Sequence, residues 1–225
     1  MTFFNVFLRN EHSFKYFCKK NLLNYFAHIF LSGREGQLQT GNFIGDFVKG
    51  HPGNRYPSKI SEGILLHRKI DEFTDAHPVV RETVAIVRPV FGRYSAIVVD
   101  MYFDHFLAAN FNRYSHQSIH LFAFRFYFVV LFNYRHLPSK VKTFIFHFVL
   151  THRLNKYASI AGLKNSLEIM QKHKIPAFDP ELIIGYLNEN SNEIEKNFHR
   201  FFPDLIAFVD NLNSDSYQAG MHHPV

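Results

Sequence analysis

The 225-residue sequence has a single cysteine, Cys18, and no tryptophan. A lone cysteine cannot form an intramolecular disulfide, and it excludes a zinc site built from several cysteines. This composition favours a reducing, cytoplasmic setting. A metal site in this chain would therefore combine histidine with acidic side chains.

Long apolar runs are also lacking. Charged residues such as Arg9 and Glu11 interrupt the first 20 residues, and no small-residue cleavage site follows, so no secretory signal is expected. The most apolar window, Ile119 to Phe132, contains Arg125 and is shorter than the roughly 20 residues that span a bilayer. A membrane span is not expected either.

The charge is positive but without a basic block. The formal net charge is +6 and the sequence pI is near 9.3. This balance favours an acidic partner, which could be nucleic acid, anionic lipid or an acidic protein. Because the Lys and Arg residues are scattered, charge alone does not choose among these.

Alternating, strand-like patterns are scarce, and helical spacing of apolar residues dominates. The Phe-rich stretch 118–132 suits a strand or a buried helix, and its length favours the helix. The 27 Phe residues indicate an aromatic core. We therefore predict an all-α fold, a compact single-domain bundle of about six to eight helices. The clearest helical stretches are Ser58 to Ala76, Val79 to Phe91, Tyr94 to Asn110 and Pro180 to Phe202.

Proline and glycine mark the expected helix ends. Pro57 and Ser58 can open the helix that carries His67, Pro78 closes it, and Gly92 separates the next two helices. We expect residues 1–22 to be an N-terminal extension, residues 23–210 to form the helical domain and residues 211–225 to be a flexible C-terminal tail.

One predicted helix carries a stripe that changes from apolar to polar. On a wheel of roughly 100° per residue, Ile60, Ile64, His67, Asp71 and Asp75 all lie on one face. His67 and Asp71 are four residues apart and are therefore neighbours. Asp75 is open to a second interpretation, as the cap of the helix that starts near Pro78.

A second predicted helix is apolar nearly all round, yet Asp100 and Asp104 lie one turn apart on the face of Ile97. Two interior carboxylates are costly unless something positive compensates them. A divalent metal would do so, and pairing with Arg or Lys is the alternative. His105 lies about 100° from Asp104, so the two need not share one ligand sphere.

Two further candidates lie earlier in the chain. Asp46 in GNFIGDFVKG follows Gly45, in a short turn that presents one carboxylate. His28 in NYFAHIFLS lies among apolar residues and could equally be a core histidine. Mixed His and Asp ligands without Cys suit manganese, iron, magnesium or catalytic zinc.

The order of these segments resembles the acyl carrier protein phosphodiesterase family. The segments are NYFAHIFLS, GNFIGDFVKG, GILLHRKIDEFTDAHPVVRE and DMYFDHFLAANF, followed by HRLNKYASIAGL and FHRFFPDLIAFV. The resemblance covers about Leu23 to Asp210. The combination of GDFVKG, LHRxIDxFTDxHP and DxxFDHFLA in this order is far more specific than any one motif.

The resemblance implies a fold similar to helical HD-type metal hydrolases and a divalent cation, typically Mn²⁺, with Mg²⁺ or Fe²⁺ as alternatives. It implies hydrolysis of the phosphodiester between 4′-phosphopantetheine and the serine of holo-acyl carrier protein, an acidic partner. By this resemblance the expected catalytic residues are His67, Asp71, Asp104 and His105. The expected metal ligands are Asp46, His67, Asp71, Asp100 and Asp104, with His28 and Asp75 as further candidates.

Arg68, Lys49 or Arg81 could bind the phosphate, since guanidinium suits bidentate phosphate contacts. Two rival interpretations remain open. One is an HD-like phosphohydrolase of a small nucleotide, and the other is a non-catalytic helical module that binds an acidic carrier protein. Nucleic acid is not expected as a partner, and the sequence leaves the oligomeric state open.

Overall fold

The computed structural model describes residues 25–173 and 175–221, and in these residues every regular element is helical. This confirms the all-α prediction, while the predicted extension 1–22 lies outside the described residues. The α-helices are α2 (Tyr25–Leu31), α3 (Gly36–Ile44), α4 (Ser58–Ala76), α5 (Pro78–Phe91), α6 (Ser95–Ala109), α7 (Phe111–Tyr114), α8 (Ile119–Phe132), α9 (Ser139–Lys142), α10 (Ile145–Leu150), α11 (Arg153–Lys156), α12 (Ile160–His173) and α13 (Pro180–Met221). The 3₁₀ turns are η1 (Gly45–Phe47), η2 (Gly53–Arg55), η3 (Gly92–Tyr94) and η4 (Tyr134–His136).

Proline sets both ends of α4, as predicted. Pro57 is extended (φ −51°, ψ 148°) and the helix begins at the next residue. His77 is extended (φ −67°, ψ 129°) because the following Pro78 disfavours helical geometry, and Pro78 then opens α5 as its first residue. Gly92 ends α5 at φ 53°, a conformation that favours glycine.

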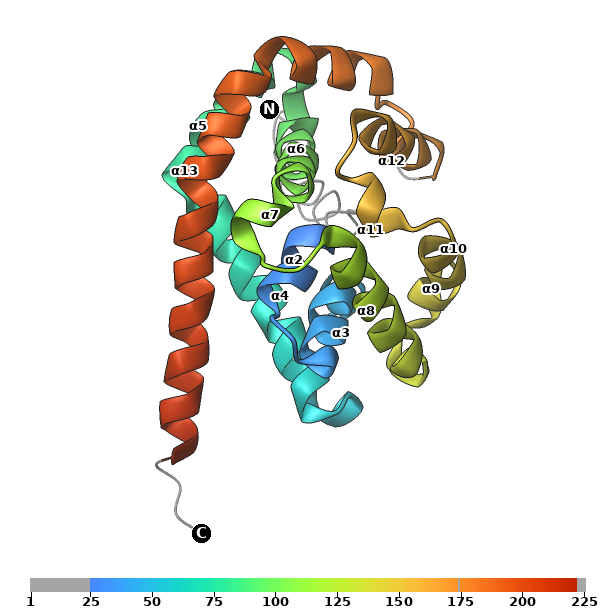
Figure 1. Cartoon of the computed structure of the whole chain (residues 1–225), viewed down its shortest axis with the longest axis vertical. Coiled ribbons are helices and arrows are strands. Elements are labelled where there is room, and N and C mark those ends of the chain that lie inside the picture. The colour runs from blue at the N-terminus through green and yellow to red at the C-terminus, as the bar shows by residue number, and fades with distance from the viewer. Residues whose placement is uncertain (1–24, 174, 222–225) are drawn as a thin grey trace, which may run out of the picture.

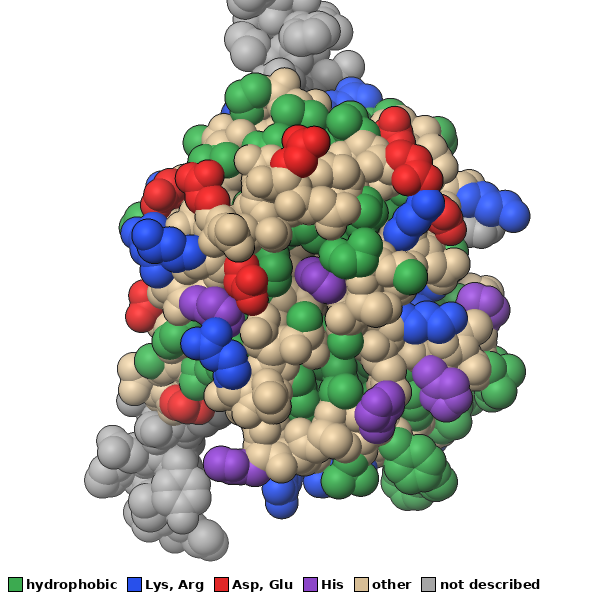
Figure 2. All heavy atoms as spheres, turned by 45° about the horizontal axis from the view of Figure 1, so that its top comes forward, with side chains coloured by type: hydrophobic (Ala, Val, Ile, Leu, Met, Phe, Trp, Pro, Cys, Tyr) green, Lys and Arg blue, Asp and Glu red, His purple; other side chains and the backbone are tan. Residues whose placement is uncertain are grey.

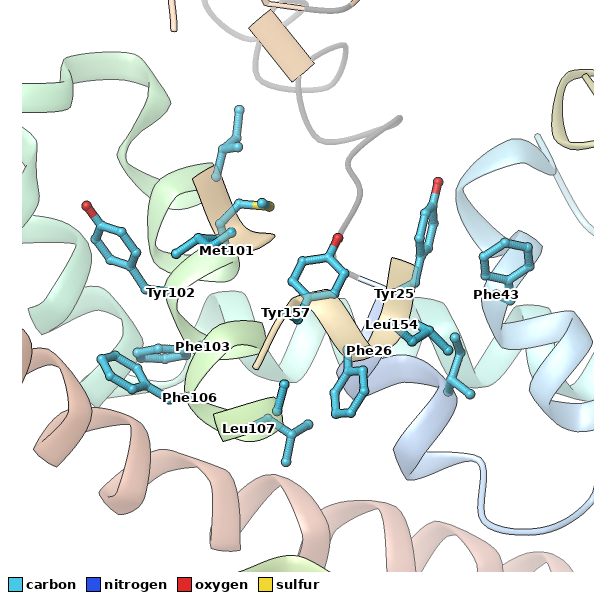
Figure 3. Packing of buried hydrophobic residues seen from close by; sticks show 14 of the residues in the cluster. Tyr25, Phe26, Phe43, Met101, Tyr102, Phe103, Phe106, Leu107, Leu154 and Tyr157 are labelled. Atoms are coloured by element: carbon cyan, nitrogen blue, oxygen red, sulfur yellow. The ribbon is translucent and has the colours of Figure 1, made fainter. Parts of the chain in front are cut away.

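Aromatic side chains fill the core, as the Phe content predicts. Helix α6 is buried nearly all round. Its Tyr102, Phe103 and Phe106 point away from Phe26 and Tyr157 (Figure 3), and the rings of Phe103 and Phe106 pack on Phe198 of α13. Edge-to-face ring pairs recur, for example Phe43 with Phe126 at 5.3 Å between centroids. Such pairs are a favoured arrangement of aromatic rings.

Two glycines let α3 and α4 approach very closely. A Cβ atom built on Gly41 would lie 2.1 Å from the backbone oxygen of Ile60, and one on Gly63 would lie 2.2 Å from that of Leu38. Only hydrogen fits at these positions, so the two backbones can touch. This close crossing brings the Asn42 end of α3 against the His67 turn of α4.

Helix α13 is longer than the sequence predicts. It does not stop before Pro203 but continues to Met221, since Phe201, Phe202 and Leu205 on both sides of the proline are buried in the core. The first part of the predicted tail is therefore helical, and the flexibility of residues 211–225 stays a prediction. Figure 1 shows α13 along one side of the molecule, with α8, α9 and α10 on the opposite side.

None of the helices in the described residues is long and apolar enough to cross a membrane.

Candidate metal centre

His67 lies on α4 with its ring buried and its two nitrogens in different environments. Nδ1 lies 2.8 Å from the backbone oxygen of Asn42, and because that oxygen can only accept, Nδ1–H donates. Nε2 faces Asp46 Oδ1 at 3.3 Å and Asp71 Oδ2 at 3.4 Å, yet this buried atom has no hydrogen bond of good geometry. A lone pair aimed at two carboxylates requires a positive species between them, either a proton or a metal ion.

His28 on α2 presents a second imidazole in the same way. Its Nδ1 lies 2.9 Å from the side-chain oxygen of Asn42, whose amide nitrogen donates to Ser32 Oγ. The Ser32 bond orients the Asn42 amide, so His28 Nδ1–H is the donor and Nε2 carries the lone pair. That Nε2 lies 3.4 Å from Asp71 Oδ1.

Asp71 completes a three-residue group of ligand atoms. One ligand atom each from His28, His67 and Asp71 lie within 4.8 Å of one another. The two histidines are buried, whereas the Asp71 side chain is 45% exposed, so the group is open to solvent on one side. Two neutral imidazoles and a carboxylate are a donor set that suits a catalytic divalent cation with an open position.

Asp46 adds a fourth possible ligand, a carboxylate oxygen, next to this group. It lies in η1, which rests directly on the ring of His67 because Gly45 has no side chain. A Cβ atom on Gly45 would lie 2.3 Å from His67 Cγ. The predicted short turn is thus confirmed as a structural feature, and its carboxylate is within reach of the same cation.

The electrostatics of His67 reflect this surrounding. Burial disfavours the charged ring, but the negative charges of Asp71 and Asp46 outweigh it and raise the pKa of His67 to about 9. The site thus attracts positive charge strongly enough to hold a proton on a buried imidazole near neutral pH.

Asp104 is buried as predicted, but the structure places its carboxylate on the start of α2. Oδ2 accepts the backbone N–H of Phe26 and Oδ1 accepts that of Ala27, both at 3.0 Å. Burial nevertheless raises the pKa of Asp104 to about 7, against the lowering effect of these two bonds. This geometry gives Asp104 a positioning role, because it fixes the helix that carries His28.

A cavity of about 70 Å³ adjoins the metal group. Its wall includes Asp46, Asp71, Asp75 and Asp100, so the structure brings the predicted acids of η1, α4 and α6 together. Asp75 lies inside α4, and the N-cap position of α5 is occupied by His77. The cavity also has an apolar wall, which includes Phe103, Phe198, Phe201, Phe202 and Leu205.

The remaining predicted residues lie outside this cavity. The Nδ1–H of His105 donates to the backbone oxygen of Tyr157 at 2.7 Å, since that oxygen can only accept. Burial lowers the pKa of His105. Arg68 donates to the backbone oxygens of Val48 and Gly50, and Arg81 donates to that of Asp75. Lys49 is exposed, and none of these three cations lines the cavity.

Asn42, the residue that orients both histidines, is not among the site residues predicted from the sequence. A metal-binding histidine usually donates its other N–H to an oxygen acceptor, so a polar residue in the apolar stretch before GDF was a signal for such a partner. The sequence offered no comparable signal for the apolar wall from α13.

These features define an all-helical protein whose His and Asp side chains, from separate helices, can hold a divalent cation beside an acidic cavity. More particularly, the chain belongs to the acyl carrier protein phosphodiesterase family, whose model matches residues 23–205. The family resemblance expected from the motifs is confirmed.

Individual relatives agree with this membership. A Salmonella agona protein named acyl carrier protein phosphodiesterase is 29% identical over 195 residues, which is 82% of this chain and 96% of the relative. A Yersinia pestis protein of the same name is 36% identical over 91 residues, which covers 40% of this chain and 47% of that relative. No solved structure matches the chain.

Proposed function

We propose that this chain hydrolyses the phosphodiester between 4′-phosphopantetheine and the serine of holo-acyl carrier protein, with a divalent metal ion as cofactor. Water adds to phosphorus, the bond from phosphorus to the serine oxygen breaks, and that oxygen takes up a proton. The products are apo-acyl carrier protein and free 4′-phosphopantetheine.

The observation that carries this proposal is the pair of imidazole Nε2 atoms held toward Asp71. Both Nδ1 atoms are tied to Asn42, which leaves both Nε2 lone pairs directed to one place, and the buried Nε2 of His67 has no satisfactory hydrogen bond. His28, His67 and Asp71 would hold the metal, and Asp46 lies within reach of it. The bound cation would neutralise phosphoryl charge and make a water more acidic near neutral pH.

The residues of the chain supply the other requirements. Asp75 and Asp100 line the cavity and can take the proton that the attacking water loses. The apolar wall of Phe103, Phe198 and Phe202 excludes water from one side and strengthens electrostatic interactions inside the cavity. Asp104 binds the start of α2 and so keeps His28 of that helix next to His67.

Three finer points belong to the same proposal. Mn²⁺ is our first candidate for the metal, with Mg²⁺ or Fe²⁺ as alternatives, because mixed nitrogen and oxygen ligands suit these ions. We place the fold among helical HD-type metal hydrolases, which an experimental structure with bound metal would test. The chain should act in the cytoplasm, and its net charge of +6 should steer an acidic carrier toward it.

The proposal is tested by the mass of the carrier. Holo-acyl carrier protein is incubated with the metal-free chain after addition of Mn²⁺, Mg²⁺ or Fe²⁺, and its mass is followed with time. We expect loss of the prosthetic arm with at least one metal and none with chelator present. An unchanged carrier mass with all three metals, together with hydrolysis of a nucleotide phosphate, would identify a small-molecule phosphohydrolase instead.

The matched control is Asp210→Asn, a conservative change in the last described part of α13, against Asp71→Asn at the centre. Only the Asp71 variant should lose turnover, because it removes one ligand oxygen while the volume of the side chain is kept.

A further inference from the structure

Large apolar side chains protrude from α8 and α10. On α8 they recur three or four residues apart and form one stripe, and on α10 two more are exposed one turn apart. Phe132 is 90% exposed, Leu150 77% and Phe128 67%. We call this surface the α8–α10 face, and it consists of Leu121, Phe124, Phe128, Phe132, Phe146 and Leu150.

The two parts of this face are held together by aromatic contacts. Tyr127 of α8 packs its ring on Phe148 of α10 at 6.0 Å, and Tyr134, just after α8, packs on Phe146 at 5.5 Å. The exposed rings of Phe124 and Phe128 lie 5.2 Å apart. Large apolar side chains that are exposed on neighbouring elements are a feature of interaction sites.

The stretch of sequence that carries this face has basic but no acidic residues. Between Asp104 and Glu168 the sequence contains no Asp or Glu. In the described residues, no ion pair joins Arg125, Arg135 or Lys140 to an acidic side chain, and all three are exposed. Figure 2 shows hydrophobic and His side chains at the lower right, with no acidic side chain among them. The basic residues of this stretch are Arg113, Arg125, Arg135, Lys140, Lys142, Arg153, Lys156 and Lys164.

The α8–α10 face is separate from the candidate metal centre. No residue from α7 through α12 lines the cavity, whereas α13, on the opposite side of the molecule, supplies much of its wall (Figure 1). A carrier protein docked on the α8–α10 face would lie away from the cavity that must receive its phosphodiester. A second copy of the chain, joined through the same face on both copies, would bring like charges together.

We infer that the α8–α10 face seats the protein on an anionic lipid surface. Aromatic and aliphatic side chains would enter the boundary between headgroups and acyl chains, and the surrounding Lys and Arg would contact lipid phosphates. The helices lie along the surface without crossing it, and the cavity stays accessible from water. This inference is independent of the proposed reaction.

The test uses the full chain and vesicles of phosphatidylcholine with or without phosphatidylglycerol, separated from free protein by flotation. The chain should bind the vesicles with phosphatidylglycerol, bind those without it far less, and dissociate as salt is raised. The double variant Phe128→Ser with Phe132→Ser should lower the partition coefficient about tenfold or more. Arg125→Glu with Arg135→Glu should remove the preference for the anionic lipid.

The matched control is Val90→Ser with Leu182→Ser, which removes two exposed apolar side chains from α5 and α13 instead. It should bind vesicles like the unmodified chain. The inference would be overturned if the unmodified chain did not bind anionic vesicles. It would also be overturned if the Phe128/Phe132 variant and the Val90/Leu182 variant lost vesicle binding to the same degree. Two other results of the Phe128/Phe132 variant would overturn it as well: weaker binding to apo-acyl carrier protein without lipid, or conversion of a dimer to a monomer without any lipid binding.

Discussion

The imidazole rings of His28 and His67 stack, with centroids 4.0 Å apart and planes 22° apart. Both rings are buried, and their Nδ1 atoms bond to the side-chain and backbone oxygens of one residue, Asn42. Two charged rings would repel at this distance. Both Nε2 atoms are turned to Asp71, and one shared metal ion in place of a proton would leave both rings uncharged.

Asn42→Ala should weaken metal binding while the ligands themselves remain. It removes the acceptor of His28 Nδ1–H, but the backbone bond to His67 is kept. Loss of such an outer partner typically costs about 10- to 100-fold in metal affinity. Calorimetric titration of the metal-free protein with Mn²⁺ measures this. Asn133→Ala removes a buried asparagine elsewhere and should leave the affinity unchanged, and an equal loss in both variants would refute the orienting role.

Gly45→Ala should displace His67. The added Cβ would lie 2.3 Å from Cγ of the ring, so either the ring or η1 must move. We expect loss of metal binding and a decrease of about 1–3 kcal/mol in the free energy of unfolding, as for other overpacked sites. Gly185→Ala is the control, because nothing lies within 4 Å of its new Cβ. Normal metal binding in Gly45→Ala would show that the ring can shift without consequence.

Metal affinity should fall as the pH is lowered. The metal-free protein holds a proton on His67 up to about pH 9, because Asp71 and Asp46 outweigh the effect of burial on its pKa. A metal must displace this proton, so the apparent affinity should fall about tenfold for each pH unit below 9. Calorimetry in buffers of different ionisation enthalpy should record one proton released per metal bound. An affinity independent of pH between 7 and 9 would contradict the assignment of His67 as a ligand.

The same pKa shift has a consequence for the metal-free fold. The pKa of His67 is 6.5 in the unfolded chain and about 9 in the folded protein. Protonated His67 therefore stabilises the folded state fully below pH 6.5, and this stabilisation is lost as the pH rises toward 9. His67→Gln should not show this loss when unfolding by urea is compared across that range.

Asp104 should matter for stability as well as for turnover. Asp104→Ala removes the acceptor of two backbone N–H groups at the start of α2, which should cost about 1–3 kcal/mol. Its pKa is raised from 3.8 to about 7, so the unfolded state ionises first and the folded state loses stability as the pH rises between these values. The advantage of the unmodified chain over Asp104→Asn should therefore shrink from pH 4 to pH 7, as urea unfolding can measure. If the difference in unfolding free energy between the two proteins stayed constant with pH, the pKa of Asp104 would not be raised.

Local signals in the sequence predict much of this fold. Pro57 and Pro78 set the ends of α4, and the four-residue spacing of His67 and Asp71 already places them on one face. The wheel of α6 also predicts that Asp104 is buried. In each case the information lies within one helix.

Contacts between distant segments could not be predicted in this way. The partner of Asp104 is the start of α2, 78 residues earlier, and no pattern within α6 reveals it. Asn42 acquires its role only because Gly41 and Gly63 let α3 and α4 touch. Helix α13 passes Pro203 because of the core contacts on both sides, which outweigh the local signal to stop.

The most direct test follows metal occupancy and reaction in the same samples. Metal-free protein is titrated with Mn²⁺, and bound metal and formation of apo-acyl carrier protein are measured at each point, for the unmodified chain and for His67→Ala. We predict that turnover rises in proportion to bound metal in the unmodified chain, and that His67→Ala shows neither bound metal nor turnover. Full turnover without metal, or equal metal binding in both proteins, would contradict a centre formed by His28, His67 and Asp71.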